Sequence, residues 1–282
     1  MTFDLLSYRV WLCSRAPMLF PENSASNVLR GALGAMLRRN HCTRECNPEM
    51  GCERRDSCAY AQIFEPGPAA HTAPSGLTDW PRPFVLRAAH LSGKTFVPGE
   101  PFWFDINLFE TRHPNIGVFA EAFASWANLI SVQTVGTEPM VSIPLVPALT
   151  PVQSLRVHFR TPTELKGASK SRPEFQVLFA RAQDRVSTLR QLYGPGSLSV
   201  DFRAMRSRAA AIRLTHCELR HVSAGRRSSR TGQVHGLGGF VGFADYEGAL
   251  SEFLPYVEAA RWTGVGRQCV WGKGELGWEP IG

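Results

Sequence analysis

Hydrophobic positions recur along the first half of the chain with two different periods. Apolar and polar residues alternate over 3–14, which predicts a strand, whereas the apolar residues of 24–40 recur with the period of an amphipathic helix. The later apolar runs predict, in order, two strands, a helix and a strand, at 84–90, 102–110, 115–130 and 141–146. The predicted order of the first half is therefore β-α-β-β-α-β.

The second half repeats this order after Pro147 and Pro151, which bracket a predicted linker. The predicted elements are strand 155–160, helix 173–193, strands 210–221 and 234–243, helix 246–260 and strand 266–271. Two consecutive units of this kind predict an α+β protein made of two tandem ferredoxin-like, RRM-like domains. We place these domains at 1–147 and 152–282, and antiparallel sheets of this type leave one face free for RNA.

A Cys-rich insertion interrupts the first predicted domain at about 42–80. Its four thiols are those of Cys42, Cys46, Cys52 and Cys58. Such a cluster is typical of a structural zinc site, but its spacing departs from paired Cys-x-x-Cys ligands. Zinc, reduced thiols and a disulfide therefore all fit the pattern. Four thiolate ligands would leave no open position for a reactive water, so any zinc would be structural.

The charge balance adds a candidate partner. The chain has 31 Lys and Arg against 24 Asp and Glu, a net charge of +7, and most of the cations are Arg. Guanidinium groups suit phosphates and stack on bases, so this surplus favours a nucleic acid, although a basic surface without a partner has the same composition. Between 203 and 230 the only acid is Glu218, and the arginines are Arg203, Arg206, Arg208, Arg213, Arg220, Arg226, Arg227 and Arg230.

The start of the chain and its apolar runs exclude some locations. The first residues contain Asp4 and read as a strand and not as a signal peptide, and the apolar stretches are too short and interrupted to cross a membrane. We therefore expect a cytoplasmic protein that does not contact a membrane.

Several segments occur in an order that resembles a known family. Residues 159–166 read Phe-Arg-Thr-Pro-Thr-Glu-Leu-Lys, and an Arg-rich segment at 227–232 precedes a Gly-rich one at 236–242. Near the end, 263–274 contains Gly-x-Gly-Arg followed by Gly-Lys-Gly, and the first helix carries Leu-Arg-Gly-Ala-Leu-Gly at 29–34. In order and spacing these segments are similar to those of the CRISPR-associated RAMP-superfamily endoribonucleases that process precursor crRNA.

The resemblance implies a function. The expected activity is metal-independent, site-specific cleavage of CRISPR repeat RNA, which leaves 2′,3′-cyclic phosphate and 5′-hydroxyl ends and needs no catalytic cofactor. The expected partners are the repeat hairpin, the mature crRNA and other CRISPR effector subunits. Some relatives keep the cleaved RNA, so a non-cleaving crRNA-binding scaffold subunit is the alternative, and a zinc-containing nucleic-acid module outside CRISPR biology is a third.

The first predicted helix is the candidate source of catalytic groups. Metal-independent RNA cleavage needs a base for the 2′-hydroxyl proton, and in this family the base is often a histidine. His41 ends a polar stripe that also holds Arg30 and Arg38, whose charges would stabilise the phosphorane. His41 also adjoins Cys42, so it could instead be a metal ligand or an ordinary surface histidine.

The candidate RNA-binding residues come from the Arg-rich segments and the Gly-rich ending. Glycine allows a backbone to approach an RNA strand closely, although it equally allows a tight intramolecular turn. The predicted RNA contacts are Lys166, Lys170, Arg203, Arg206, Arg226, Arg227, Arg230, Gly264, Gly266, Arg267, Gly272 and Lys273.

Overall fold

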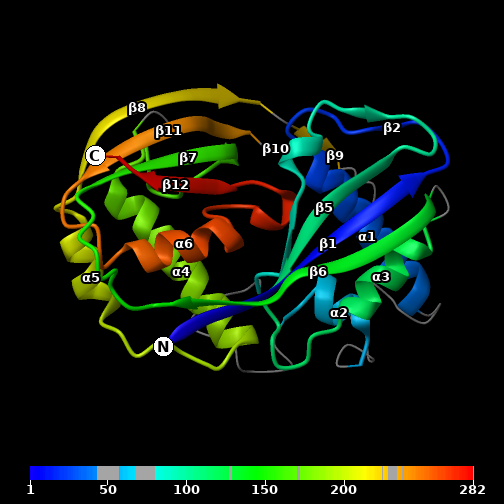
Figure 1. The fold of residues 1–282 in the computed structure, drawn as a ribbon, viewed down its shortest axis with the longest axis horizontal. Coiled ribbons are helices and arrows are strands. Elements are labelled where there is room, and N and C mark those ends of the chain that lie inside the picture. Colours follow the sequence, from blue (N-terminus) through cyan, green and yellow to red (C-terminus); the bar gives the residue numbers. More distant parts are fainter. Residues whose placement is uncertain are drawn as a thin grey trace.

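The computed structural model places two antiparallel sheets beside one another, each with helices packed against it (Figure 1). The structure describes residues 1–42, 57–67, 80–126, 129–169, 172–223, 225–227, 234–236 and 238–281. The predicted α+β architecture of two ferredoxin-like units is confirmed, because each sheet has the strand order and each half the element order of that fold.

The N-terminal sheet has the order β3-β5-β1-β6. Its unit consists of β1(Thr2–Ser14), α1(Ala25–His41), β3(Phe84–Arg87), β5(Pro101–Leu108), α3(Ile116–Ala124) and β6(Leu129–Pro144). The additional elements are the short helices α2(Ala59–Phe64) and η1(Ala89–Leu91), and a small ribbon formed by β2(Met18–Leu19) and β4(Thr95–Phe96). Helix α1 forms where it was predicted because Leu29, Leu33 and Leu37 are fully buried on one side of it.

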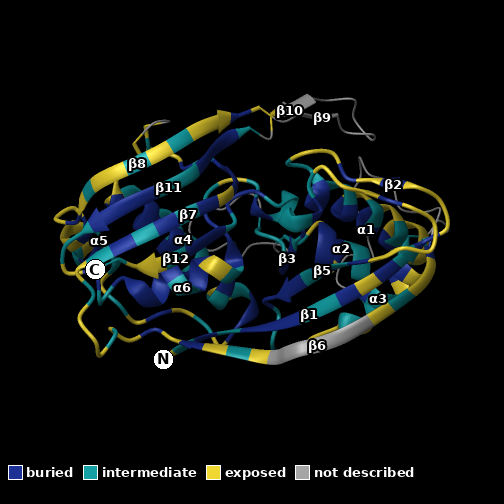
Figure 2. Ribbon diagram, turned by 45° about the horizontal axis from the view of Figure 1, so that its top comes forward, coloured by how far each residue is buried: buried dark blue, intermediate teal, exposed yellow. Residues whose placement is uncertain are grey.

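The C-terminal sheet has the order β12-β7-β11-β8. Its unit consists of β7(Ser154–Thr163), α4(Phe175–Tyr193), α5(Phe202–Ala209), β8(Arg213–Val222), β11(Gly239–Glu247), α6(Leu254–Thr263), η2(Cys269–Trp271) and β12(Leu276–Pro280). Between β8 and β11, β9(Gly225–Arg227) pairs with β10(Val234–Gly236) as a separate ribbon. Exposed residues follow β8 along the sheet edge, whereas β7 and β11 are largely buried (Figure 2).

Three predicted elements of the second half were wrong in their bounds. The strand predicted at 234–243 is divided between β10 and β11, which belong to different sheets. The helix predicted from 246 begins only at Leu254, because β11 continues to Glu247 and a turn follows at Gly248. The strand predicted at 266–271 is a loop with one 3₁₀ turn, because the glycines on either side of that turn have positive φ angles, and the last strand is β12.

Two elements of the first half also differ from the prediction. The helix predicted to reach residue 130 ends at Ala124. The strand predicted at 141–146 begins at Leu129, which makes it the longest strand in the described part of the chain. Helix α5 was not predicted, because its eight residues include four that are charged or hydroxylated and only a short apolar side.

The two domains share part of their hydrophobic core. Phe3, Leu5, Val85 and Phe109 of the N-terminal half pack in the same cluster as the C-terminal core, whereas α1 and α3 cover a second, separate cluster. Within the described residues, no helix has both the length and the apolar character that crossing a membrane requires.

Candidate functional site

The Gly-rich segment near the end of the chain forms a loop that is fixed to the end of β7. The Gly274 N–H donates to the Pro162 carbonyl at 3.1 Å, and the Arg267 N–H donates to the Glu164 carbonyl at 3.0 Å. Two segments that carry the family resemblance, 159–166 and 263–274, are therefore in direct contact.

The glycines of this loop are required by contacts inside the protein. Gly266 has φ +82°, and a Cβ there would lie 2.3 Å from the Glu164 carbonyl oxygen. Gly272 has φ +84°, and a Cβ there would lie 2.4 Å from the Cβ of Ser26 at the start of α1. Gly264 likewise faces Cys269. These contacts account for the glycines without RNA, and the predicted RNA contact stays a prediction.

Two cations of the loop share one acid. The Lys273 ammonium lies 3.3 Å from Glu164 Oε2 and 3.0 Å from the side-chain oxygen of Gln268, and the lysine side chain is only 2% exposed. Burial lowers the pKa of Lys273, and Glu164 partly opposes that shift. The Arg267 guanidinium lies 3.1 Å from the other Glu164 oxygen and is 60% exposed. Of the two, Arg267 is therefore the one that faces solvent.

A cationic groove lies between this loop, α4 and the segment before β3. Its volume is about 660 Å³, and Trp80 and Trp271 contribute aromatic walls. Asp184 is its one acidic lining residue among those described, against the cations Arg82, Lys166, Arg181, Arg185 and Arg267. The groove combines positive charge with aromatic rings, which is the composition that suits a nucleic-acid strand.

Packing contacts hold several of these arginines in place. Arg82 donates to the Phe64 carbonyl at 3.0 Å, and Arg185 donates to the Thr263 carbonyl at 2.8 Å. Arg181 pairs with Asp184 at 3.2 Å. Sequence reasoning missed Arg82, Arg181 and Arg185; only the last two had a signal, their four-residue spacing on one face of a helix.

The polar stripe of α1, which was predicted to hold Arg30, Arg38 and His41, is covered in its middle. Arg30 is 5% exposed, and its Cζ lies 4.6 Å from the centre of the Phe64 ring and 5.4 Å from that of Trp271. Gly34, one turn further, packs against the same Phe64 ring. Helix α2 covers this face because its Ile63 and Phe64 are buried there, and the periodicity of α1 alone carries no information about that partner.

His41 lies at the far end of α1, beside the start of α2. Its Nε2 is buried and has no hydrogen-bond partner in the described part of the chain, and its carbonyl accepts from the Cys58 thiol at 3.9 Å. Arg38 is exposed one turn before it. Arg30 and His41 are about 16 Å apart along the helix axis, so they cannot hold the same phosphate oxygen.

The remaining candidates are dispersed. Arg203 and Arg206 lie on α5, on the helical side of the domain, where Arg206 bonds the side chains of Gln183 and Asp184. The backbones of Arg226 and Arg227 pair within the β9–β10 ribbon. The remaining predicted residues Lys170, Arg230, Cys46 and Cys52 lie outside the described residues.

The zinc prediction concerns only two described cysteines. No disulfide joins Cys42 to Cys58, and Cys58 is buried. Among the described residues no group of three or more His, Cys, Asp and Glu side chains could hold a metal. Because two of the four predicted ligands are not described, zinc binding stays a prediction.

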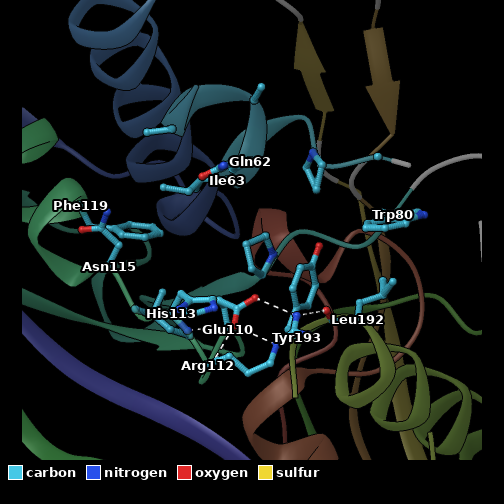
Figure 3. Close-up of a pocket in the computed structure, with 16 residues that line it drawn as sticks. Gln62, Ile63, Trp80, Glu110, Arg112, His113, Asn115, Phe119, Leu192 and Tyr193 are labelled. Atoms are coloured by element: carbon cyan, nitrogen blue, oxygen red, sulfur yellow. Dashed lines mark hydrogen bonds and ion pairs between the residues drawn. The ribbon is translucent and has the colours of Figure 1, made fainter. Parts of the chain in front are cut away.

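A second pocket, of about 450 Å³, lies between α2, the end of β5, the start of α3 and the end of α4. Figure 3 shows Glu110 and Arg112 pointing toward one another in it, and their side chains pair at 3.3 Å. Burial raises the pKa of the nearby Tyr193 phenol, which donates to the Pro81 carbonyl at 2.6 Å. The acidic and basic side chains that line this second pocket balance one another. The cationic groove is therefore the better site for a polyanion.

Family models match both halves of the chain. Residues 3–132 match a family described only as an N-terminal domain, and residues 157–276 match the family CRISPR-associated endoribonuclease Cas6. No curated protein sequence matches the chain.

Solved structures with a similar fold are only distantly related in sequence. Thermus thermophilus Cas6 is 16% identical, with a TM-score of 0.55 and coverage of 99% of both chains. A further Cas6, solved as a product complex, is 18% identical, with a TM-score of 0.53 and coverage of 98% of this chain and 99% of that one. A chain of a Cas6-RT-Cas1–Cas2 complex is 11% identical, with a TM-score of 0.56, and the match covers 99% of this chain but 29% of that chain.

Proposed function

We propose that this chain, whose residues 157–276 match the family of CRISPR-associated endoribonucleases Cas6, cleaves CRISPR repeat RNA at one site to produce mature crRNA. The observation that carries the proposal is the cationic groove beside the Gly-rich loop, because it joins the matched domain to the segment before β3. Its charge and two tryptophans fit a single RNA strand. The solved Cas6 relatives include a product complex and a substrate-mimic complex.

The proposed reaction uses the RNA's own 2′-hydroxyl as the nucleophile and no metal. A base removes the 2′ proton, the 2′ oxygen forms a bond to phosphorus, and the bond from phosphorus to the 5′ oxygen breaks. An acid protonates that leaving oxygen, so the products are a 2′,3′-cyclic phosphate and a 5′-hydroxyl. Cations beside the phosphate stabilise the charge that develops on its oxygens.

We assign the base to His41 and the charge stabilisation to Arg38. Support for His41 comes from its Nε2, which has no hydrogen-bond partner within the described residues, and from its place at the end of α1. One Cas6 relative was solved as a histidine-to-alanine mutant. Arg30 is a positioning residue in this proposal, because it lies under Phe64 and Trp271 and would act through the Trp271 wall of the groove.

The RNA backbone would follow the groove past Lys166 and Arg267, the exposed cations nearest the Gly-rich loop. The ribbon carrying Arg226 and Arg227 would contact the repeat hairpin. Mature crRNA and other CRISPR effector subunits are the proposed partners, and the Cas6-RT-Cas1–Cas2 complex is a case in which a similar chain is assembled with CRISPR proteins. Any zinc held by the Cys-rich insertion would be structural.

The first prediction concerns catalysis. The protein should cut a repeat transcript in the presence of EDTA, and His41→Ala should lower the cleavage rate about 100-fold or more, because general base catalysis contributes about 10² to 10⁴. Arg38→Ala should lower the rate with little change in RNA affinity. Single-turnover rates on end-labelled RNA, with analysis of the product ends, measure both effects.

His113→Ala is the matched control, because this exposed histidine lies in the second pocket and not on α1. Cleavage that requires added metal, or a His41→Ala rate equal to wild type, would contradict the proposed mechanism.

A non-cleaving scaffold is the second candidate, and one observation favours it. Two of the three predicted catalytic groups, Arg30 and His41, are separated by about 16 Å along α1. Tight binding of repeat RNA by the wild-type protein without any cleavage would establish the scaffold function instead.

A further inference from the structure

The outer faces of the two sheets carry the same arrangement of three side chains. In the N-terminal sheet, Arg9 on β1 lies directly opposite Asp105 on β5, and Trp103 precedes that aspartate by two residues. In the C-terminal sheet, Arg156 on β7 lies directly opposite Asp245 on β11, two residues after Phe243. We call these sets the Arg–Asp–aromatic clusters.

The N-terminal cluster holds its guanidinium against a ring. Arg9 Nε lies 2.8 Å from Asp105 Oδ1, and Arg9 Nη2 lies 3.1 Å from Oδ2. The Arg9 Cζ lies 3.5 Å from the centre of the Trp103 ring. His90 stacks on the same ring at 3.9 Å, and Trp11 lies beside it with its ring centre 6.3 Å away.

The C-terminal cluster repeats this geometry closely. Arg156 makes two bonds of 2.7 Å to the two carboxylate oxygens of Asp245, and its Cζ lies 4.0 Å from the centre of the Phe243 ring. Two histidines flank that ring, His158 at 6.3 Å and His216 at 5.6 Å between ring centres.

Each arginine is thereby fixed in orientation but not covered. The bidentate carboxylate sets the plane of the guanidinium, and the aromatic ring occupies one face of that plane. The side chains remain about one third exposed, 32% for Arg9 and 31% for Arg156. Hydrogen bonding to Asp105 and Asp245 raises the pKa of both arginines, so the planar cation persists at every physiological pH.

This arrangement differs from a phosphate site. A phosphate binds through the in-plane N–H groups of an arginine, and here the aspartates already accept from two of the five on each guanidinium, which leaves fewer for a phosphate. The free face of a guanidinium can instead stack on a nucleobase, as unpaired RNA bases do on arginine planes and aromatic rings. A cross-strand ion pair kept for stability alone would need neither the ring nor the open face.

We propose that the outer guanidinium faces of Arg9 and Arg156 are two stacking platforms for unpaired bases of the bound RNA, one on each sheet. The identity of the ligand as RNA rests on the proposed function, but the platforms themselves rest on the repeated geometry. They would bind single-stranded segments outside the cationic groove with little preference for base identity, because every base has a stacking face.

The test uses Arg9→Lys and Arg156→Lys in the full-length protein, since lysine keeps the charge and loses the plane. The probe is an unstructured RNA oligonucleotide that contains 2-aminopurine, and the fluorescence of this base reports stacking. Fluorescence anisotropy measured at several salt concentrations gives the Kd and the salt slope. Each variant should bind about 5- to 100-fold more weakly and lose 2-aminopurine quenching, with an unchanged salt slope. Arg213→Lys is the control, because that arginine on β8 is 74% exposed and pairs with Glu247 without a ring.

Three results would overturn the platforms. One is an unchanged Kd, and another is weaker binding with a smaller salt slope, which would identify a phosphate contact. The third is a loss of affinity that accompanies a lower Tm. Cleavage of repeat RNA is measured on the same samples. Wild-type protein that fails to cleave but binds RNA through Arg9 and Arg156 would overturn the proposed cleavage and leave the platforms standing.

Discussion

The exposure of a cationic side chain in this protein depends mainly on the residues that pack against it. Lys273 and Arg30 both belong to cationic segments, yet each is at most 5% exposed, one beside Glu164 and the other against Phe64 and Trp271. Arg267, which belongs to the same loop as Lys273, remains exposed beside the same acid, Glu164. A cation's place in the sequence therefore does not decide whether it can meet a phosphate.

His90 provides a prediction at this scale. Burial lowers the pKa of its imidazole, and its hydrogen bond to the Trp103 carbonyl opposes the shift only in part. Because the folded pKa lies below the unfolded value of about 6.5, the stability present above that value is lost as the pH falls through the folded pKa. Tm should therefore drop between pH 7.5 and pH 5, and by less in His90→Gln.

Thermal unfolding followed by circular dichroism across that pH range measures the effect. His113→Gln serves as the control, because this exposed residue should leave the pH dependence as in wild type. A His90→Gln protein with the full wild-type pH dependence would assign the acid sensitivity to other groups.

At the scale of elements, the Gly-rich loop connects β7, α6 and the start of α1. Backbone hydrogen bonds tie it to Pro162 and Glu164, and Gly272 touches Ser26 on α1. The side of the cationic groove that this loop forms depends on these contacts, because the loop carries Trp271 and Arg267.

Gly272→Ala should destabilise the protein by about 2 to 4 kcal/mol. The φ angle of +84° strains any residue with a Cβ, and that Cβ would meet Ser26 at 2.4 Å. Urea denaturation gives the change in the free energy of unfolding. Gly31→Ala is the contrasting variant, since nothing lies within 4 Å of a Cβ there, and it should stabilise α1 by about 0.5 to 1 kcal/mol. Equal effects at both positions would refute this account.

At the scale of the whole molecule, the domains are joined at the C-terminal end of α6. Its last carbonyls accept from side chains elsewhere: Trp262 from Arg87 at 2.8 Å and from Asn107 at 2.9 Å, and Thr263 from Arg185 at 2.8 Å. These donors satisfy carbonyls that a helix cannot bond internally, and the cations favour the negative end of its dipole. Burial lowers the pKa of Arg87, and Glu275 partly opposes that shift.

Arg87→Met should weaken the coupling between the domains. The substitution removes a buried cation that contacts the Arg261 and Trp262 carbonyls and Glu275. It should lower the free energy of unfolding by about 3 kcal/mol. Calorimetry should show a lower Tm and a broader transition, or two transitions. Arg213→Met, which breaks an exposed pair with Glu247, should cost less than about 1 kcal/mol. A single sharp transition at the wild-type Tm would show that Arg87 does not couple the domains.

The order of elements and the resemblance to CRISPR-associated endoribonucleases were apparent from the sequence itself. Strand and helix periods are local, so β1, α1, β5 and α4 were predicted close to their observed bounds, and the two ferredoxin-like units followed from their order. Local patterns failed where glycine set the backbone, as at 266–271, and where a strand ran into a turn, as at 246–253. The surplus of arginine also favoured a nucleic-acid partner, which stays a proposal.

Only the tertiary structure decided which charges act together. Arg9 and Asp105 are 96 residues apart and Arg156 and Asp245 are 89 apart, yet both pairs meet at the same register on a sheet. The groove likewise combines Arg82, Lys166 and Arg267 from three distant segments, while folding buries Arg30 and Lys273. The physical reason is that ion pairing, stacking and desolvation depend on distances and burial in space, which composition and periodicity do not contain.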